Sequence, residues 1–152
     1  MVTNEGKNLL DPGKTPHENQ QFLLILASII AAVDKHADLL RMSASTPGND
    51  HRLGANEAPP AIISMYLGDQ VGDIVEQILK NGKATSSLSS GTLEFGIKKL
   101  PVLEKDPTDR NRTSPFAFTG NRFEFRMVAS SNSIGDTNTV LNAMMQKHLA
   151  KL

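Results

Sequence analysis

The sequence predicts a fold of the α+β class, with three main helices and a few antiparallel strands. Its 152 residues are enough for one domain, or at most two small ones. Two observations support that class. A long segment rich in Leu, Ala, Ile and Gln follows a polar lead-in and is typical of a helix. Residues 122–128 instead alternate between charged and apolar side chains, as a half-buried strand does.

The first helix-rich segment runs from Thr15 to about Ser43. Thr15 can accept a hydrogen bond from a first-turn N–H, Pro16 suits the first helical position, and Glu18 can complete a capping box. Residues 22–33 are apolar on nearly all sides, so we expect this part of the helix to be buried against more than one neighbour. The need to bury so many sides of one helix indicates that a partner surface packing against it is missing from this chain.

The middle of the chain combines a long loop, a second helix and a short strand. Residues 44–60 contain Pro and Gly at five positions and form a loop of a length that is often functional. A second helix is expected over Ala61–Lys80, with Gly82 as its stop. A short strand is expected over Thr92–Ile97, and residues 98–115 are expected to form a loop.

The last two elements are a strand over Arg122–Val128 and an amphipathic helix over about Asp136–Leu152. The strand's period of two places Arg122, Glu124 and Arg126 on one face and Phe123, Phe125 and Met127 on the other. We expect the apolar face to be buried and the charged face to look toward solvent or a site.

Charge and composition exclude several classes of function. Sixteen Lys and Arg balance sixteen Asp and Glu, which disfavours a strongly basic nucleic-acid-binding protein. The absence of cysteine excludes disulfides, thiol catalysis and iron–sulfur clusters. The N-terminus does not resemble a signal peptide, and the longest apolar run, residues 22–33, is shorter than the roughly 20 residues of a membrane span. We expect a cytoplasmic protein with no nucleic-acid or membrane partner.

The sequence contains none of the common phosphate-binding or metal-binding motifs considered below. Neither GxxxxGK[ST] nor GxGxxG occurs, so both familiar phosphate loops are absent. The four histidines lack the spacing of metal ligands. The three on expected helices, His17, His36 and His148, are predicted to lie at the surface.

The arginine distribution is the strongest local signal. Arg110, Arg112, Arg122 and Arg126 are four of the six arginines and lie within seventeen residues. Guanidinium groups stay charged and hold oxyanions through two parallel hydrogen bonds, so the cluster suits a carboxylate or phosphate ligand. The alternative is a half-buried strand with a solvated ladder of ion pairs.

A second signal lies in the long loop, where residues 49–57 combine titratable and amide side chains with a glycine. Arg52 could hold an anion and Glu57 could take a proton, which fits acid–base work on an anionic substrate. The alternative is an ordinary polar loop before a helix, with Asn56 or Glu57 capping that helix.

The chain resembles type III glutamine synthetase in two long segments, NDHRLGANEAPPAIIS (residues 49–64) and DRNRTSPFAFTGNRFEFRM (residues 109–127). NLLDPGKTPHENQQFLL (residues 8–24) and SNSIGDTNTVLN (residues 131–142) resemble the same family, so the resemblance covers essentially the whole chain. In ordinary members the Glu-Ala-Pro motif lies close before Asn-Arg-Ser/Thr, whereas a helix and a loop separate them here. The resemblance therefore implies a partial catalytic domain over residues 1–152, with a type III-like insertion at about residues 61–108.

That resemblance implies an ATP-dependent ligase that makes glutamine from glutamate and ammonia through γ-glutamyl phosphate. Glutamate, ammonia and ATP are thus the implied partners. Arg52 matches the arginine that holds the substrate glutamate. Glu57 matches the flap carboxylate that closes over the intermediate and takes a proton from ammonium, and Arg112 matches an arginine that contacts the transferring phosphate.

The strand residues match further family positions. Arg122 matches an arginine on the nucleotide side, and Glu124 matches a carboxylate ligand of the nucleotide-side Mg²⁺ or Mn²⁺. Arg126 matches an arginine at the glutamate and phosphate end. Ordinary members carry one more arginine where this chain has Ala117, so the resemblance leaves a second nucleotide contact unassigned.

Other parts of the family's site have no counterpart in this chain. The remaining metal carboxylates and the strand that completes each site across a subunit boundary of the homo-oligomer lie upstream of the matching segment in the family. We therefore expect the isolated chain to be inactive, because one metal ligand cannot hold a metal cluster. The alternative function is that of a truncated, catalytically inactive helix-rich fragment or interaction module.

Overall fold

A computed structural model of the chain describes residues 1–56, 58–88, 92–93, 103–104 and 114–151. Its helices are the 3₁₀ turn η1 (Pro16–Glu18) and α1 (Gln20–Lys35), α2 (Ala37–Ser43), α3 (Pro47–Asp50), α4 (Gly68–Asn81) and α5 (Gly135–Leu149). Its strands are β1 (Met65–Tyr66), β2 (Thr92–Leu93), β3 (Leu103–Glu104), β4 (Phe116–Phe118) and β5 (Phe123–Phe125). This mixture of helices with a small sheet confirms the predicted α+β class.

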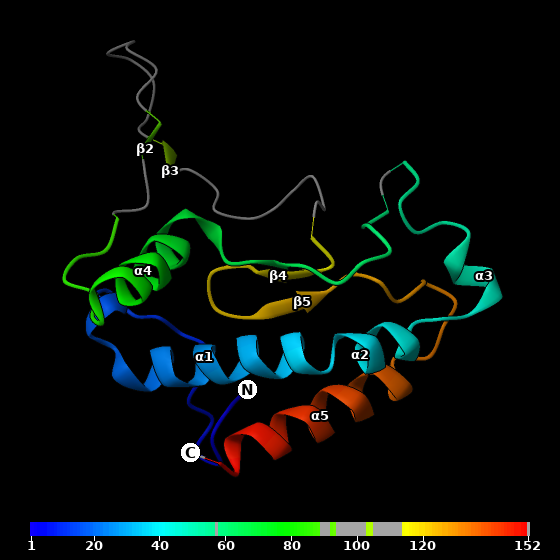
Figure 1. Cartoon of the computed structure of the whole chain (residues 1–152), viewed down its shortest axis with the longest axis horizontal. Helices are drawn as coiled ribbons and strands as arrows, with labels where there is room; N and C mark the ends of the chain where they lie inside the picture. Colours follow the sequence, from blue (N-terminus) through cyan, green and yellow to red (C-terminus); the bar gives the residue numbers. More distant parts are fainter. Residues whose placement is uncertain (57, 89–91, 94–102, 105–113, 152) are drawn as a thin grey trace.

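Helix α1 lies between the main sheet and α5 (Figure 1). The sheet has the order β1-β4-β5, and β4 pairs with β5 antiparallel. Strand β1 pairs with β4 in parallel, so this pair differs from the few antiparallel strands that the sequence predicted. Parallel pairing is possible here because almost fifty residues separate the two strands and allow the chain to return to the same end of the sheet.

The first helix-rich segment is divided rather than continuous. The 3₁₀ turn ends at Glu18, and the side chain of Asn19 caps α1 by accepting a hydrogen bond from the Phe22 N–H at 3.1 Å. Thr15 makes no side-chain cap, so the predicted capping box was wrong. His36 then separates α1 from α2 with a φ of −121°.

Helix α1 is buried on two sides, as its all-round apolar sequence predicted. Ile29 and Val33 pack with Phe116 of β4 and Met144 of α5 in the largest core cluster. A second cluster joins the N-terminal half of the helix to α4 and β4 and contains Phe22, Leu26, Val71 and Phe118. The helix therefore holds the sheet, α4 and α5 together.

The second predicted helix begins later than expected. Helix α4 starts at Gly68, and the preceding residues include β1, whose pairing with β4 outweighs any helical tendency there. Gly82 ends the helix in the left-handed conformation with a φ of 74°, and its N–H donates to the Ile78 carbonyl at 2.8 Å. The predicted stop is confirmed.

The remaining boundaries differ in detail. Strand β2 coincides with the start of the strand expected over Thr92–Ile97, whose other residues lie outside the described part of the chain. Strand β3 lies within the segment expected to be a loop, and β4 was not predicted as a strand. Helix α5 begins at Gly135 and ends at Leu149, close to the expected bounds.

Candidate functional site

Three of the six predicted site residues line one hollow of about 570 Å³, called the polar hollow below. Arg52 reaches it from the loop of residues 44–60, and Glu124 and Arg126 reach it from β5 and the residue that follows. The other described residues that line it are Gly48, Pro59, Val128, Ala129, Ser130 and Ser131. Two guanidinium groups and one carboxylate at a single hollow suit an anionic ligand together with a cation held by the carboxylate.

The two faces of β5 separate as the sequence predicted. Phe123 stacks on Phe116 of β4 with ring centroids 5.0 Å apart, and Phe125 packs against the same core. On the other face, Oε2 of Glu124 lies 3.4 Å from Nη2 of Arg126, and Oε1 lies 3.6 Å from Nε of Arg122. These two ion pairs are long, so the carboxylate is held loosely.

Arg122 stands apart from the other strand residues. Its side chain is 71% exposed, and it lines a different cavity of about 420 Å³ on the α5 side of the molecule. Arg126 is 14% exposed at its side chain and lines the polar hollow. The pairing with Glu124 keeps Arg122 near the site, but its guanidinium does not line the polar hollow itself.

Arg52 is fixed by shorter contacts than the strand residues. Its Nε donates to Oδ1 of Asn49 at 2.6 Å, and its Nη2 donates to the Met127 carbonyl at 2.8 Å. Asn49 is fully buried and was not identified as a site residue from the sequence. Its signals in the sequence were its place in the amide-containing segment 49–57 and its spacing of three residues before Arg52.

The loop beyond Arg52 closes on itself. The Gly54 N–H donates to the Pro59 carbonyl at 2.8 Å, with Gly54 at a φ of 80° that favours glycine. Asn56 also adopts a positive φ of 46°, which its short polar side chain tolerates. The predicted flap residue Glu57 belongs to this segment but lies outside the described residues, as does Arg112.

Arg41 of α2 holds the outside of the same loop. Its Nη2 pairs with Oδ1 of Asp50 at 2.9 Å, and its Nε donates to the Ala61 carbonyl at 2.9 Å. Ser45 donates a further hydrogen bond to Asp50 at 3.0 Å. The hydrogen bond from Arg41, followed by that from Ser45, lowers the pKa of the Asp50 carboxyl below its ordinary value of 3.8.

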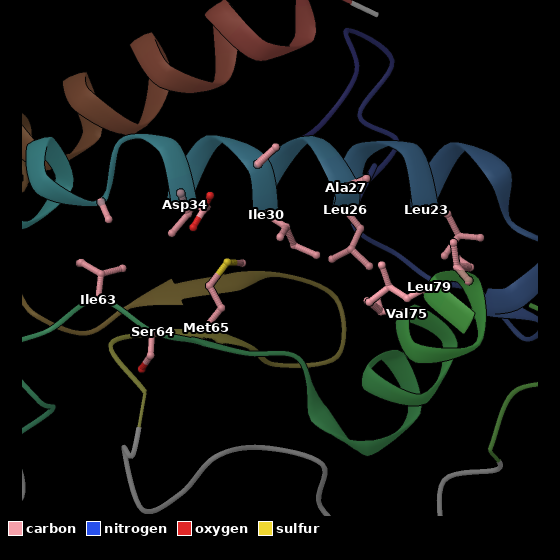
Figure 2. A pocket seen from close by; sticks show the side chains of 14 residues that line it. Leu23, Leu26, Ala27, Ile30, Asp34, Ile63, Ser64, Met65, Val75 and Leu79 are labelled. Carbon is pink, nitrogen blue, oxygen red and sulfur yellow. The ribbon is translucent and has the colours of Figure 1, made fainter. Parts of the chain in front are cut away.

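A second large cavity offers little chemistry. It has a volume of about 540 Å³ and lies between α1, α4 and residues 63–65. Figure 2 shows its apolar side chains facing one another, among them Leu26, Ile30 and Val75. Among the residues that the structure describes, Asp34 is the sole ionisable one lining this cavity, so the polar hollow remains the better candidate site.

The described ranges hold neither a cluster of metal ligands nor a membrane-spanning helix. Within them, no group of three or more His, Asp or Glu side chains could hold a metal ion, so Glu124 has no companion ligands there. None of the helices in this part of the chain has the length and apolar character needed to cross a bilayer.

The chain is similar to known proteins over nearly its whole length. It is 53% identical over 149 residues to the Type-3 glutamine synthetase of Dictyostelium discoideum, covering 98% of this chain and 20% of the relative. It is 47% identical over 152 residues to the glutamine synthetase of Bacteroides fragilis, covering 98% and 21%. A glutamine synthetase of Butyrivibrio fibrisolvens is 52% identical over 124 residues, covering 82% and 17%. No family model matches the chain. The chain thus spans about a fifth of the length of these curated relatives.

Proposed function

We propose that this chain, which belongs to the glutamine synthetase family, supplies the glutamate- and phosphate-binding part of a glutamate–ammonia ligase site. The observation that carries the proposal is the convergence of Arg52, Glu124 and Arg126 on the polar hollow. These residues come from two segments more than seventy positions apart in the sequence. Their meeting at one hollow is the arrangement that a shared site requires.

The proposed roles follow the charge of each side chain. Arg52 holds a carboxylate of glutamate, because a planar guanidinium with fixed orientation matches two carboxylate oxygens. Arg126 faces the phosphate end of the same ligand, where a permanent cation neutralises charge that develops during phosphoryl transfer. Arg112 and Glu57 complete the proposal, as a second phosphate contact and as the base that takes a proton from ammonium.

We also propose that the site binds ATP and a divalent cation. Glu124 offers the hard oxygen ligand that Mg²⁺ or Mn²⁺ prefers, and its long ion pairs leave the carboxylate exchangeable. The described residues supply only this one carboxylate at the polar hollow, so the other ligands must come from elsewhere in the polypeptide. Arg122, beside Glu124, is the proposed contact on the nucleotide side.

We also propose how the chain is organised into domains and assembled. Residues 1–152 form part of a catalytic domain, and residues from about 61 to 108 form an insertion that packs on α1 through Val71. We also propose a homo-oligomer, as the resemblance implies, and a cytoplasmic location, as the sequence's lack of a recognisable targeting or membrane segment led us to expect. The isolated chain is expected to be inactive, because the resemblance places the family's other metal carboxylates outside the matching segment.

A chimera tests the proposed function. In it, this chain replaces the matching 149-residue segment of the Dictyostelium discoideum relative, to which it is 53% identical. The purified chimera is given glutamate, ATP, Mg²⁺ and hydroxylamine, and γ-glutamyl hydroxamate is measured. We expect turnover by the chimera, none by the isolated chain, and a loss of about 100-fold or more in Glu57→Gln.

Glu76→Gln is the matched control for that substitution. Glu76 lies on α4, pairs with Lys80 at 2.9 Å and is largely exposed, so its loss should leave turnover unchanged. A chimera that folds and assembles as its parent does but forms no hydroxamate would contradict the proposal. So would turnover that survives Glu57→Gln.

A further inference from the structure

Asn49 is a buried polar side chain behind Arg52, a residue that lines the polar hollow. Its relative exposure is 0%, and both ends of its amide are used. The Nδ2 group donates to the Ala44 carbonyl at 2.7 Å and to the Met127 carbonyl at 2.8 Å. The Oδ1 atom accepts from Nε of Arg52 at 2.6 Å. One side chain thus joins the end of α2, the arginine of the loop and the segment after β5.

These contacts fix the plane of the Arg52 guanidinium. A guanidinium is rigid and planar, so two hydrogen bonds at different nitrogens determine its orientation. Arg52 is held at Nε by Asn49 and at Nη2 by the Met127 carbonyl. The same Met127 carbonyl also accepts from Asn49, so the amide and the guanidinium share one anchor on the strand side of the hollow.

The geometry requires an amide at this position. Aspartate would place an oxygen against the two carbonyls that now accept from Nδ2, and burial would make that repulsion costly. Leucine has a similar size but offers no acceptor to Arg52. Serine has a single O–H donor, so it cannot replace both hydrogen bonds, to the Ala44 and Met127 carbonyls.

We propose that Asn49 is a positioning residue that presets the Arg52 guanidinium for the carboxylate of its ligand, an inference that rests on the function proposed above. Asn49 itself does not line the hollow, so it acts through Arg52 and the shared Met127 carbonyl. Its loss leaves the charge of Arg52 in place but removes the acceptor that orients it.

The test compares Michaelis constants in the active chimera. Asn49→Ala should raise KM for glutamate about tenfold or more, because a misdirected guanidinium loses at least one hydrogen bond to the ligand. KM for ATP should stay within about twofold of the parent, since this substitution removes no nucleotide contact. Asn49→Ser is measured in the same way if Asn49→Ala does not fold, and it should shift KM in the same direction.

Thr137→Val controls for a loss of stability alone. Thr137 is also buried and hydrogen-bonded, to Ser43, but it has no contact with Arg52. It should lower stability and leave both Michaelis constants unchanged. The inference is overturned if the Asn49 variants keep the parent KM for glutamate, or raise both constants equally. An inactive parent chimera would instead overturn the proposed function, so the two failures are distinguishable.

Discussion

The two sides of the polar hollow are built in opposite ways. On the loop side, Arg52 is held by contacts of 2.6 and 2.8 Å to a buried amide and a backbone carbonyl. On the strand side, Glu124 is 40% exposed at its side chain and meets its two arginines only at 3.4 and 3.6 Å. The loop side thus presents a preset cation, whereas the strand side presents a carboxylate that can exchange an arginine for another partner. In the function proposed above, the first side would bind the carboxylate of glutamate and the second would bind the divalent cation.

Met127 joins the two sides, and its removal should have the largest effect. The side chain is fully buried in a small cluster with Ala44 and Leu53, and its carbonyl accepts from Arg52. We expect Met127→Ala to lower the free energy of unfolding of the chain by roughly 2–5 kcal/mol, because the cavity cannot fully collapse. Urea denaturation measures the change.

Met127→Leu is the matched control, because it nearly conserves side-chain volume. It should lower the free energy of unfolding by less than about 1.5 kcal/mol. Equal losses in the two variants would show that packing at Met127 does not support the junction between loop and strand.

Acid should weaken the ion pair that braces the loop side. The pKa of Asp50 is lowered by hydrogen bonds from Arg41 and then Ser45, so the native chain binds fewer protons there than the unfolded chain. The stabilising contribution is complete above the ordinary value of 3.8 and is lost as pH falls through the lowered value. Thermal unfolding from about pH 5 to about pH 2 should therefore show a smaller decline in Asp50→Asn than in the parent.

The control for acid sensitivity is Glu76→Gln, since the hydrogen bond from Lys80 lowers the pKa of that carboxyl too. Glu76 lies on α4, so only Asp50→Asn should change the NMR signal of the Arg41 Nε–H, which contacts the Ala61 carbonyl. An Arg41 signal that is identical in the parent and in Asp50→Asn at neutral pH would refute the bracing role of this pair.

The smallest effect on stability is expected on the strand side. Glu124→Gln breaks two long, partly exposed ion pairs, which typically contribute less than about 1 kcal/mol. The loss should shrink further at high salt, where surface charges are screened. A salt-independent loss above about 2 kcal/mol would mean that Glu124 is a structural residue, and the contrast between the two sides would fail.

Local patterns in the sequence predicted the strand side well. The alternation over residues 122–127 places charged and aromatic side chains on opposite faces, because a strand's period of two is a local property. Gly82 predicted the end of α4 from the identity of one residue, because few residues other than glycine adopt the positive φ found there.

Long-range contacts could not be predicted in the same way. The hydrogen bond from the Asn49 side chain to the Met127 carbonyl joins positions 78 residues apart, and no local sequence pattern predicts it. The parallel pairing of β1 with β4 also depends on a distant strand.

The histidines show the same limit. The prediction that His36 and His148 lie at the surface was wrong, because their rings pack edge to face at 5.5 Å, and both residues are partly buried. That contact joins the end of α1 to the end of α5. A helical pattern identifies which face of one helix is polar, but not which distant helix covers it.

The most direct test of the central claim is a crystal structure of the chimera grown with glutamate, Mg²⁺ and a non-hydrolysable ATP analogue. We expect a carboxylate of glutamate within hydrogen-bond distance of the Arg52 guanidinium and a metal ion on the Glu124 carboxylate, at opposite sides of the polar hollow. Asn49 should keep its bond to Arg52 in that structure. Glutamate bound away from Arg52, with Glu124 still paired only to its arginines, would contradict the account.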